Sequence, residues 1–164
     1  MRQDGRLEAI WVKRVKRGPM DRLERAQLAA GWGIVGNANT GGRRQVTVIE
    51  KEVWDEITRR LGADLDPATR RANLMISGCR LAESRGRILR IGPCRIRILG
   101  ETRPCNIMED ALPGLEEALR EPWNGGAFGE VLEDGEIAVG DPVAWVEELT
   151  QSRGDAQERV LPAR

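Results

Sequence analysis

Short β-type segments, separated by turns that contain glycine, recur along most of this 164-residue chain. Partial alternation of polar and apolar residues, typical of half-buried strands, appears in residues 7–15, 45–49, 87–92, 95–100 and 126–132. An Asp-Gly pair, Asp134-Gly135, then favours a hairpin into the last apolar segments. We therefore expect a mainly β fold with short helices, arranged as a distorted β-barrel.

Two segments show helical features instead. In residues 50–61, apolar side chains recur at spacings of three and four, and Gly62 is placed to end the helix. A second short helix is predicted over residues 112–120. Residues 21–30 are predicted as a single helical turn or a loop.

The length and composition predict one soluble domain. A chain of 164 residues with 40% apolar residues can bury one sizeable core, but not two. We place this domain at residues 1–146 and expect the polar residues 147–164 to form a frayed or disordered tail.

Several function classes are excluded by residues that the chain lacks. It has no histidine, which excludes His-ligated zinc, a Ser-His-Asp triad and a histidine base. The charged first residues do not form a signal peptide, and no apolar stretch is long enough to span a membrane. Three cysteines without CxxC spacing suit a reducing compartment, so we expect a cytoplasmic protein.

The formal net charge is zero, but the charges are unevenly distributed. Basic residues are in excess up to Arg103, and acidic residues dominate from Glu109 to Glu158. The two interpretations are a surface with two differently charged halves, or a basic region that recognises an anionic small molecule. Nucleic acid is not expected as a partner, because the chain is neutral overall and lacks basic residues interleaved with exposed aromatics.

Several short motifs follow one another in a fixed order. A glycine-rich stretch, residues 33–42, leads into Arg43-Arg44-Gln45-Val46, and the predicted helix at residues 50–61 contains glutamates. The later motifs are Arg71-Ala72-Asn73-Leu74, the hairpin segment 86–92, Arg103-Pro104-Cys105 and the closing segment 135–143.

In this order, the motifs resemble those of the MOSC domain, the molybdenum cofactor sulfurase C-terminal domain family, over residues 7–146. The resemblance implies a barrel of the pyruvate-kinase β-barrel type and an association with molybdenum cofactor (molybdopterin). Many family members carry Gly-Asp-x-His in the glycine-rich loop, where this chain has Gly36-Asn37-Ala38-Asn39. Proton transfer or metal contact through that acid–imidazole pair is therefore unavailable here.

The resemblance makes Cys105 the family cysteine, and we predict it as the catalytic residue and the metal ligand. Arg103 lies two residues earlier, and a neighbouring guanidinium favours the thiolate, the form that binds metal or attacks sulfur. A soft thiolate also suits molybdenum or a persulfide. The alternative is that Cys105 is a small buried apolar residue. Cys79 and Cys94 are expected to be structural.

Arginines are the candidates for binding the phosphate of the cofactor, because forked guanidinium groups and free backbone N–H groups recognise phosphate. For each arginine the alternative is a solvated surface charge. The predicted cofactor-binding residues are Arg43, Arg44, Arg71, Asn73 and Arg103, with Arg70 as a further candidate. The five tryptophans are expected mostly in the core, with Trp123 exposed.

Within the family, the resemblance implies two activities. One is sulfur carriage, in which Cys105 holds a persulfide; the other is molybdenum-dependent reduction of N-hydroxylated compounds. Larger family members add a pyridoxal-phosphate desulfurase domain, for which this chain has no room, so a sulfur-donor desulfurase or an electron-transfer protein is the expected partner. The alternative is a non-catalytic binding module for an anionic small molecule or a partner protein.

Overall fold

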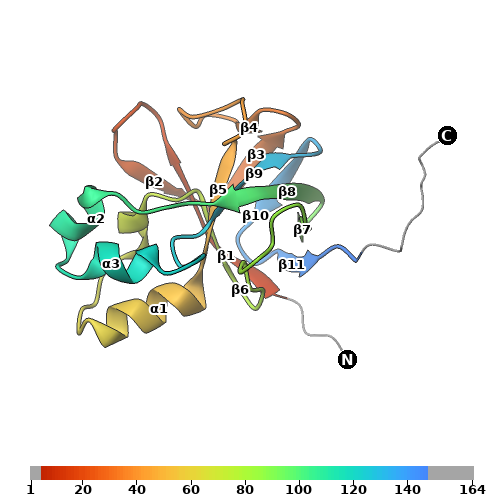
Figure 1. The fold of residues 1–164 in the computed structure, drawn as a ribbon. Coiled ribbons are helices and arrows are strands. Elements are labelled where there is room, and N and C mark those ends of the chain that lie inside the picture. Colours follow the sequence, from red (N-terminus) through yellow and green to blue (C-terminus); the bar gives the residue numbers. More distant parts are fainter. Residues whose placement is uncertain (1–4, 148–164) are drawn as a thin grey trace.

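The computed structural model describes residues 5–147, in which strands dominate and three short α-helices and one 3₁₀ turn complete the fold (Figure 1). The strands are β1 (Gly5–Lys13), β2 (Met20–Leu23), β3 (Arg25–Ala29), β4 (Gly33–Ile34), β5 (Val46–Glu50), β6 (Leu74–Ser77), β7 (Ile88–Ile91), β8 (Cys94–Glu101), β9 (Ala127–Val131), β10 (Gly135–Ala138) and β11 (Pro142–Trp145). The helices are α1 (Lys51–Arg60), α2 (Asn106–Ala111) and α3 (Leu115–Arg120), and the 3₁₀ turn is η1 (Pro67–Arg70).

Seven of the described strands close into a barrel in the order β11-β7-β8-β9-β5-β6-β1. The closing pair is β1 with β11, which places Gly5 opposite Val143. Strands β5 and β6 are parallel neighbours, and α1 forms the crossover between them. The expectation of a mainly β fold with a distorted barrel is confirmed.

The barrel interior is filled by apolar side chains that alternate with outward-facing residues along the strands. In β8, every second residue from Cys94 to Gly100 is buried. Fully buried side chains of the same cluster include Leu7, Ile10, Val48 and Leu74. Each such side chain contributes about 1.5–3 kcal/mol by leaving water, so the barrel supplies a rigid frame for the residues at its ends.

The prediction for residues 21–30 is wrong, because this segment forms two strands. Strand β2 pairs with β1, and β3 pairs with β10 and β4 in a second, three-stranded sheet. Ala26 and Leu28 point into the core while their neighbours remain outside. Pairing with strands distant in sequence overrides the weak local preference of this polar stretch.

The three helices gather on one side of the barrel (Figure 1). Helix α1 buries Trp54 and Ile57 against Met108, Leu115 and Leu119 of the other two helices. The second helix predicted for residues 112–120 begins only at Leu115, and α2 precedes it. Gly114, with φ 91°, turns the chain between the two helices in a conformation that glycine adopts without strain.

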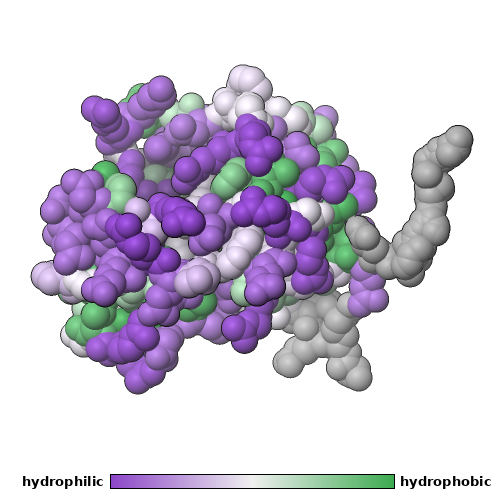
Figure 2. Space-filling model, viewed as in Figure 1, coloured by the Kyte–Doolittle hydropathy of each residue, from purple (hydrophilic) through white to green (hydrophobic). Residues whose placement is uncertain are grey.

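The face shown in Figure 2 is mostly hydrophilic, with apolar colouring in scattered areas. The prediction for Trp123 is wrong, since it is half-buried and packs against the barrel core, whereas Trp32 is 52% exposed. No helix in residues 5–147 is long and apolar enough to cross a membrane.

Candidate functional site

A basic cavity of about 200 Å³ opens at one end of the barrel. Its charged side chains are Lys13, Arg44 and Arg71, and none of its lining residues is acidic. The remaining lining residues are Met20, Asn37, Asn39, Gln45, Thr47 and Asn73. We call this the basic cavity; three cations without a carboxylate are a lining suited to an anion.

The barrel topology brings these residues together from distant parts of the chain. Strand β1 ends at Lys13, while β5 and β6 begin just after Gln45 and Asn73. Because β5 and β6 are parallel and β1 runs antiparallel to β6, all three of these ends lie at the same rim of the barrel. The predicted residues Arg44, Arg71 and Asn73 therefore line one cavity.

Two buried asparagines fix the walls of the basic cavity. Asn37 accepts the amide of Lys13 at 3.0 Å and donates to the carbonyl oxygen of Asn39 at 2.9 Å. Asn73 accepts the amide of Thr47 at 3.1 Å and donates to the carbonyl oxygen of Trp11 at 3.1 Å. Both side chains thus line the cavity, and their hydrogen bonds to the protein hold its walls in place.

The cations of the basic cavity lie close enough to repel one another. Burial is the main cause that lowers the pKa of Lys13, and the charges of Arg71 and Arg44 act in the same direction. Arg71 donates to the carbonyl oxygen of Gly18 at 2.7 Å, which fixes its guanidinium beside the loop that follows β1. A bound anion would relieve this repulsion.

Arg70 lies in a smaller cavity of about 20 Å³, which shares Arg44, Thr47 and Arg71 with the basic cavity. Its Nε donates to the carbonyl oxygen of Gly125 at 3.1 Å, and a second nitrogen approaches Oγ1 of Thr102 at 3.4 Å. Within residues 5–147 no carboxylate pairs with it. Burial lowers the pKa of Arg70 to about 10, the charge of Arg44 acts in the same direction, and Cys105 opposes both.

Cys105 is exposed and directly precedes α2, as the cap residue of that helix. It lines neither cavity, but it is close enough to Arg70 to interact with its charge. Arg44, which lines both cavities, also interacts with Arg70. Arg70 therefore interacts electrostatically both with a residue of the basic cavity and with Cys105.

Two other predicted residues lie apart from these cavities. Arg43 and Arg103 are exposed, and neither lines the basic cavity or the smaller cavity. Cys79 and Cys94 are buried in the barrel core. Burial is also the main cause that raises the pKa of the Cys94 thiol.

Sequence reasoning missed Lys13, Gln45 and Thr47 as cavity residues, and Thr102 and Gly125 as partners of Arg70. Lys13 lies within the strand predicted over residues 7–15 and belongs to no motif, so no sequence signal marked it. Gln45 and Thr47 lie in the Arg-Gln-Val strand itself, where that motif was a usable signal. In the described part of the chain, no cluster of three or more Cys, Asp or Glu residues could hold a metal ion. Among the cysteines, only Cys105 combines exposure with a neighbouring cation.

The structure is similar to several solved structures. The YuaD protein from Bacillus subtilis matches with a TM-score of 0.71 and 19% identity, over 87% of this chain and 96% of that chain. YiiM from Geobacillus stearothermophilus matches with a TM-score of 0.68 and 17% identity, over 88% of this chain and 76% of that chain. YiiM from Escherichia coli matches with a TM-score of 0.66 and 16% identity, over 87% of this chain and 70% of that chain. These likenesses support the barrel fold.

The sequence comparisons are more specific. No curated protein matches the sequence. The family model of the MOSC domain matches residues 35–144. This match runs from the loop that contains Asn37 and Asn39, through Cys105, to the last barrel strand, and the chain therefore belongs to the MOSC domain family.

Proposed function

We propose that the protein binds molybdenum cofactor, with the anionic phosphate of the cofactor in the basic cavity and Cys105 as the thiolate that meets the metal or carries sulfur. The observation that supports this most strongly is the charge of the cavity: Lys13, Arg44 and Arg71 converge without a carboxylate. Cys105 interacts with the charge of Arg70, which in turn interacts with Arg44 of the basic cavity.

The residues fit such a ligand in two respects. Guanidinium and ammonium groups would hold the phosphate, with the neutral amides of the cavity wall behind them. Arg70 is half-buried without a carboxylate partner in the described part of the chain, and a negatively charged group beside it would compensate its charge. Cys105 is exposed, so a ligand can reach its sulfur without rearrangement of the core.

In this proposal, different residues of the chain have different roles in binding the cofactor. Lys13, Arg44 and Arg71 bind and orient the anionic end of the cofactor. Arg70 places a positive charge near Cys105, where it would attract an anionic part of the ligand. When bound, the cofactor would supply two-electron redox chemistry at molybdenum. Arg43 and Arg103 stand outside both cavities and would contribute only by extending the basic surface.

Two activities are compatible with this arrangement. In sulfur carriage, a donor persulfide transfers its sulfane sulfur to the Cys105 thiolate and leaves as a thiolate. In reduction of N-hydroxylated compounds, an electron-transfer protein supplies the electrons. Either activity requires a partner, a sulfur-donor desulfurase in the first case and an electron donor in the second.

A second candidate function is a non-catalytic module that binds an anion. The observation that favours it is Asn37, which occupies the loop where relatives carry an acid–imidazole pair and whose amide is engaged with Lys13 and Asn39. The loop therefore offers no acid or base for catalysis. In this case an anion would bind, but Cys105 would take no part.

The test is the molybdenum and molybdopterin content of the protein purified from a molybdenum-replete host. We expect both in the wild type, little of either in Arg44→Ala, and wild-type content in Arg90→Ala. Arg90 is an exposed arginine of β7 outside both cavities, so its replacement controls for the change in net charge. Absence of molybdopterin from the wild type after reconstitution with the cofactor would reject the proposal.

A further inference from the structure

Exposed apolar side chains gather on two neighbouring loops at one end of the barrel. The first loop joins β1 to β2 (residues 14–19), and the second joins β3 to β5 (residues 30–45, with β4 inside it). Of the four large apolar side chains that are exposed in the described part of the chain, Val15 lies on the first loop, and Trp32 and Val35 lie on the second. Figure 1 shows both loops projecting at the end of the barrel marked by the β4 label. We call this surface the loop face.

Contacts near their bases hold the two loops side by side. The amide of Ala38 donates to the carbonyl oxygen of Lys13 at 2.7 Å. A Cβ at Gly36 would lie only 3.0 Å from a guanidinium nitrogen of Arg14. Gly36 and Arg14 are each next to an exposed valine in the sequence, so the apolar side chains of the two loops belong to one surface.

The exposure of Trp32 is built into the fold. Its amide donates to the carbonyl oxygen of Ala29 at 3.1 Å, and its own carbonyl oxygen accepts the amide of Gly41 at 2.7 Å. The backbone is thus held on both sides, while the side chain remains 52% exposed. An indole that is held at the surface beside other exposed apolar groups marks an interaction site.

The loop face is also basic. The two loops contain five arginine or lysine residues and no aspartate or glutamate. Two acidic residues of neighbouring segments contact them: Asp21 pairs with Arg14 at 3.3 Å, and Asp134 accepts the amide of Ala30 at 2.8 Å. In the described part of the chain, no ion pair engages the remaining cations of the loops outside the basic cavity, which are Lys16, Arg17 and Arg43.

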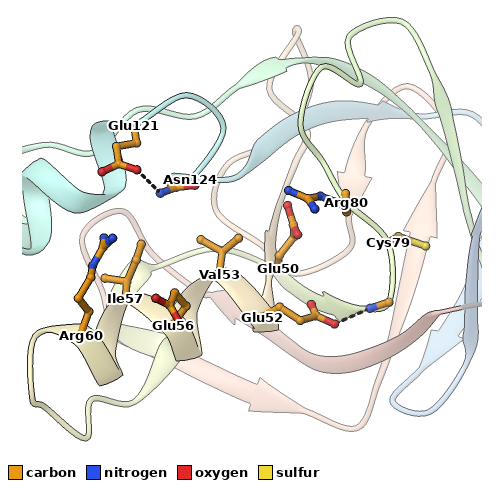
Figure 3. Close-up of a pocket in the computed structure, with 11 residues that line it drawn as sticks. Glu50, Glu52, Val53, Glu56, Ile57, Arg60, Cys79, Arg80, Glu121 and Asn124 are labelled. Atoms are coloured by element: carbon orange, nitrogen blue, oxygen red, sulfur yellow. Dashed lines mark hydrogen bonds between the residues drawn. The ribbon is translucent and has the colours of Figure 1, made fainter.

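The charges on the helical side of the molecule are mixed instead. Figure 3 shows a cavity of about 520 Å³ beside α1, where glutamates and arginines lie together. One of these glutamates, Glu52, accepts the amide of Gly78 at 2.8 Å. Mixed charges of this kind give an anionic surface little net attraction, so the loop face is the side that such a surface would meet.

We propose that the loop face binds peripherally to membranes that contain anionic phospholipids. The side chains of Val15, Trp32 and Val35 enter the headgroup layer, which is the depth that tryptophan prefers. The free cations of the same loops meet the lipid phosphate groups, and each basic residue near an anionic membrane adds to the attraction. These apolar and basic side chains lie outside the basic cavity, so the proposal is independent of cofactor binding.

A bilayer suits the loop face better than two other anionic partners. Separate side chains can enter a headgroup layer without a matching surface, whereas a stable protein interface takes about 20–30 residues on each side. Nucleic acid is bound through phosphate contacts and through aromatic stacking on bases, to which exposed valines contribute nothing. An acidic protein and a nucleic acid are therefore alternatives that the test has to separate from a membrane.

The test is co-sedimentation of the whole protein with mixed vesicles of phosphatidylcholine and phosphatidylserine and, separately, with vesicles of phosphatidylcholine alone. We expect binding to the mixed vesicles that weakens as salt is added, and binding at least about tenfold weaker to phosphatidylcholine alone. Lipids brominated in their acyl chains should quench part of the tryptophan fluorescence on binding. Trp32→Phe should lose this quenching, because Trp32 is the exposed tryptophan among the described residues.

Substitutions on the loop face should weaken binding to the mixed vesicles. Lys16→Gln combined with Arg17→Gln should weaken it at least about tenfold, because each basic residue near an anionic membrane contributes roughly fivefold. Trp32→Ala should weaken binding about tenfold, since membrane affinity scales with the buried apolar area. All three side chains are exposed, and a thermal melt checks that each variant is folded.

The matched controls are Arg60→Gln combined with Arg90→Gln for the charge, and Ile107→Ala for the apolar contact. These residues are exposed and lie outside the two loops, so their replacement should leave binding unchanged. An equal loss in a control, equal binding to both kinds of vesicle, or no quenching by brominated lipid would each overturn the proposal. Binding to single-stranded DNA but not to vesicles would reject it in favour of nucleic acid, and binding to neither would reject it in favour of an acidic protein.

Discussion

Arg70 and Gly125, 55 positions apart in the sequence, are joined by a hydrogen bond of 3.1 Å from the guanidinium to the backbone carbonyl. This contact links the 3₁₀ turn η1 to the chain that enters β9 and holds a cation near Cys105. The carbonyl of Gly125 also accepts the hydroxyl of Thr102 at 2.6 Å, so it keeps one donor when the arginine is removed.

Arg70→Met should therefore separate stability from ligand retention. Arg70 is half-buried and lacks a counter-ion among the described residues, and an apolar side chain of similar length can replace such a charge at little cost. We therefore expect the free energy of unfolding to fall by no more than about 1 kcal/mol, or to rise. Retention of molybdenum should fall, because the charge beside Cys105 is lost. Urea unfolding and metal analysis of the same preparation measure both. If the free energy of unfolding falls by more than about 3 kcal/mol, Arg70 acts mainly in stabilising the fold.

Alkylation should distinguish the three thiols. Iodoacetamide at neutral pH should label Cys105 ahead of Cys79 and Cys94, because only Cys105 is exposed. Burial raises the pKa of Cys94, which further suppresses its thiolate. Mass spectrometry of peptides over time measures the order, and labelling in denaturant should make all three reactive. Earlier labelling of Cys94 in the native protein contradicts the assignment.

Cys105→Ser should abolish molybdenum retention or persulfide loading and leave stability within about 0.5 kcal/mol. The side chain is exposed, so the serine hydroxyl is solvated and no cavity forms. The hydroxyl is too weak an acid to ionise at neutral pH and too hard to replace a thiolate. Thermal melting beside metal and sulfane-sulfur assays tests this. A variant that still loads metal and sulfur normally supports the non-catalytic module instead.

Asn73→Ala should mainly lower the stability of the protein, whereas Arg44→Ala should mainly weaken binding of the cofactor. Removal of the Asn73 amide leaves the Trp11 carbonyl and the Thr47 amide without this partner, at a cost of about 1–3 kcal/mol in stability. Arg44 is exposed, so its loss should cost little stability but weaken binding of the cofactor about ten- to a hundredfold. Chemical denaturation and ligand titration of both variants measure the contrast. Equal effects of the two substitutions on stability would contradict it.

The pH dependence of stability should contain a contribution from Glu50. Burial raises its folded-state pKa above the unfolded value, so the folded state binds this proton more tightly. The resulting stabilisation is present below the unfolded pKa, about 4.3, and is lost as the pH rises through the folded value. Glu50→Gln should therefore be more stable than the wild type at neutral pH, and the difference should shrink in acid. Urea unfolding at several pH values checks this, and a difference that grows toward acid would contradict it.

The sequence by itself determined most of the strand segments, with the exception of β2 and β3, and it indicated the MOSC family. Alternation along residues 95–100 is a local property of the chain, and β8 reproduces it because one face of that strand is buried. The stripe of Trp54 and Ile57 likewise predicted α1, since helical periodicity is visible within a few turns. The ordered motifs from the glycine-rich loop to Cys105 indicated the family for the same reason, because residue type and spacing are all that a motif requires.

Only the tertiary structure decided which charged side chains share a cavity. Lys13 and Arg71 meet because β1 and β6 are paired, and no local pattern encodes that pairing. The hydrogen bonds by which Asn73 supports the cavity wall join it to residues 26 and 62 positions away, and no motif indicated them. The burial of Glu50 depends on the turn at Leu81, which the sequence places 31 residues later. Hydrogen bonds and desolvation act between neighbours in space, and the barrel brings together neighbours that are remote along the chain.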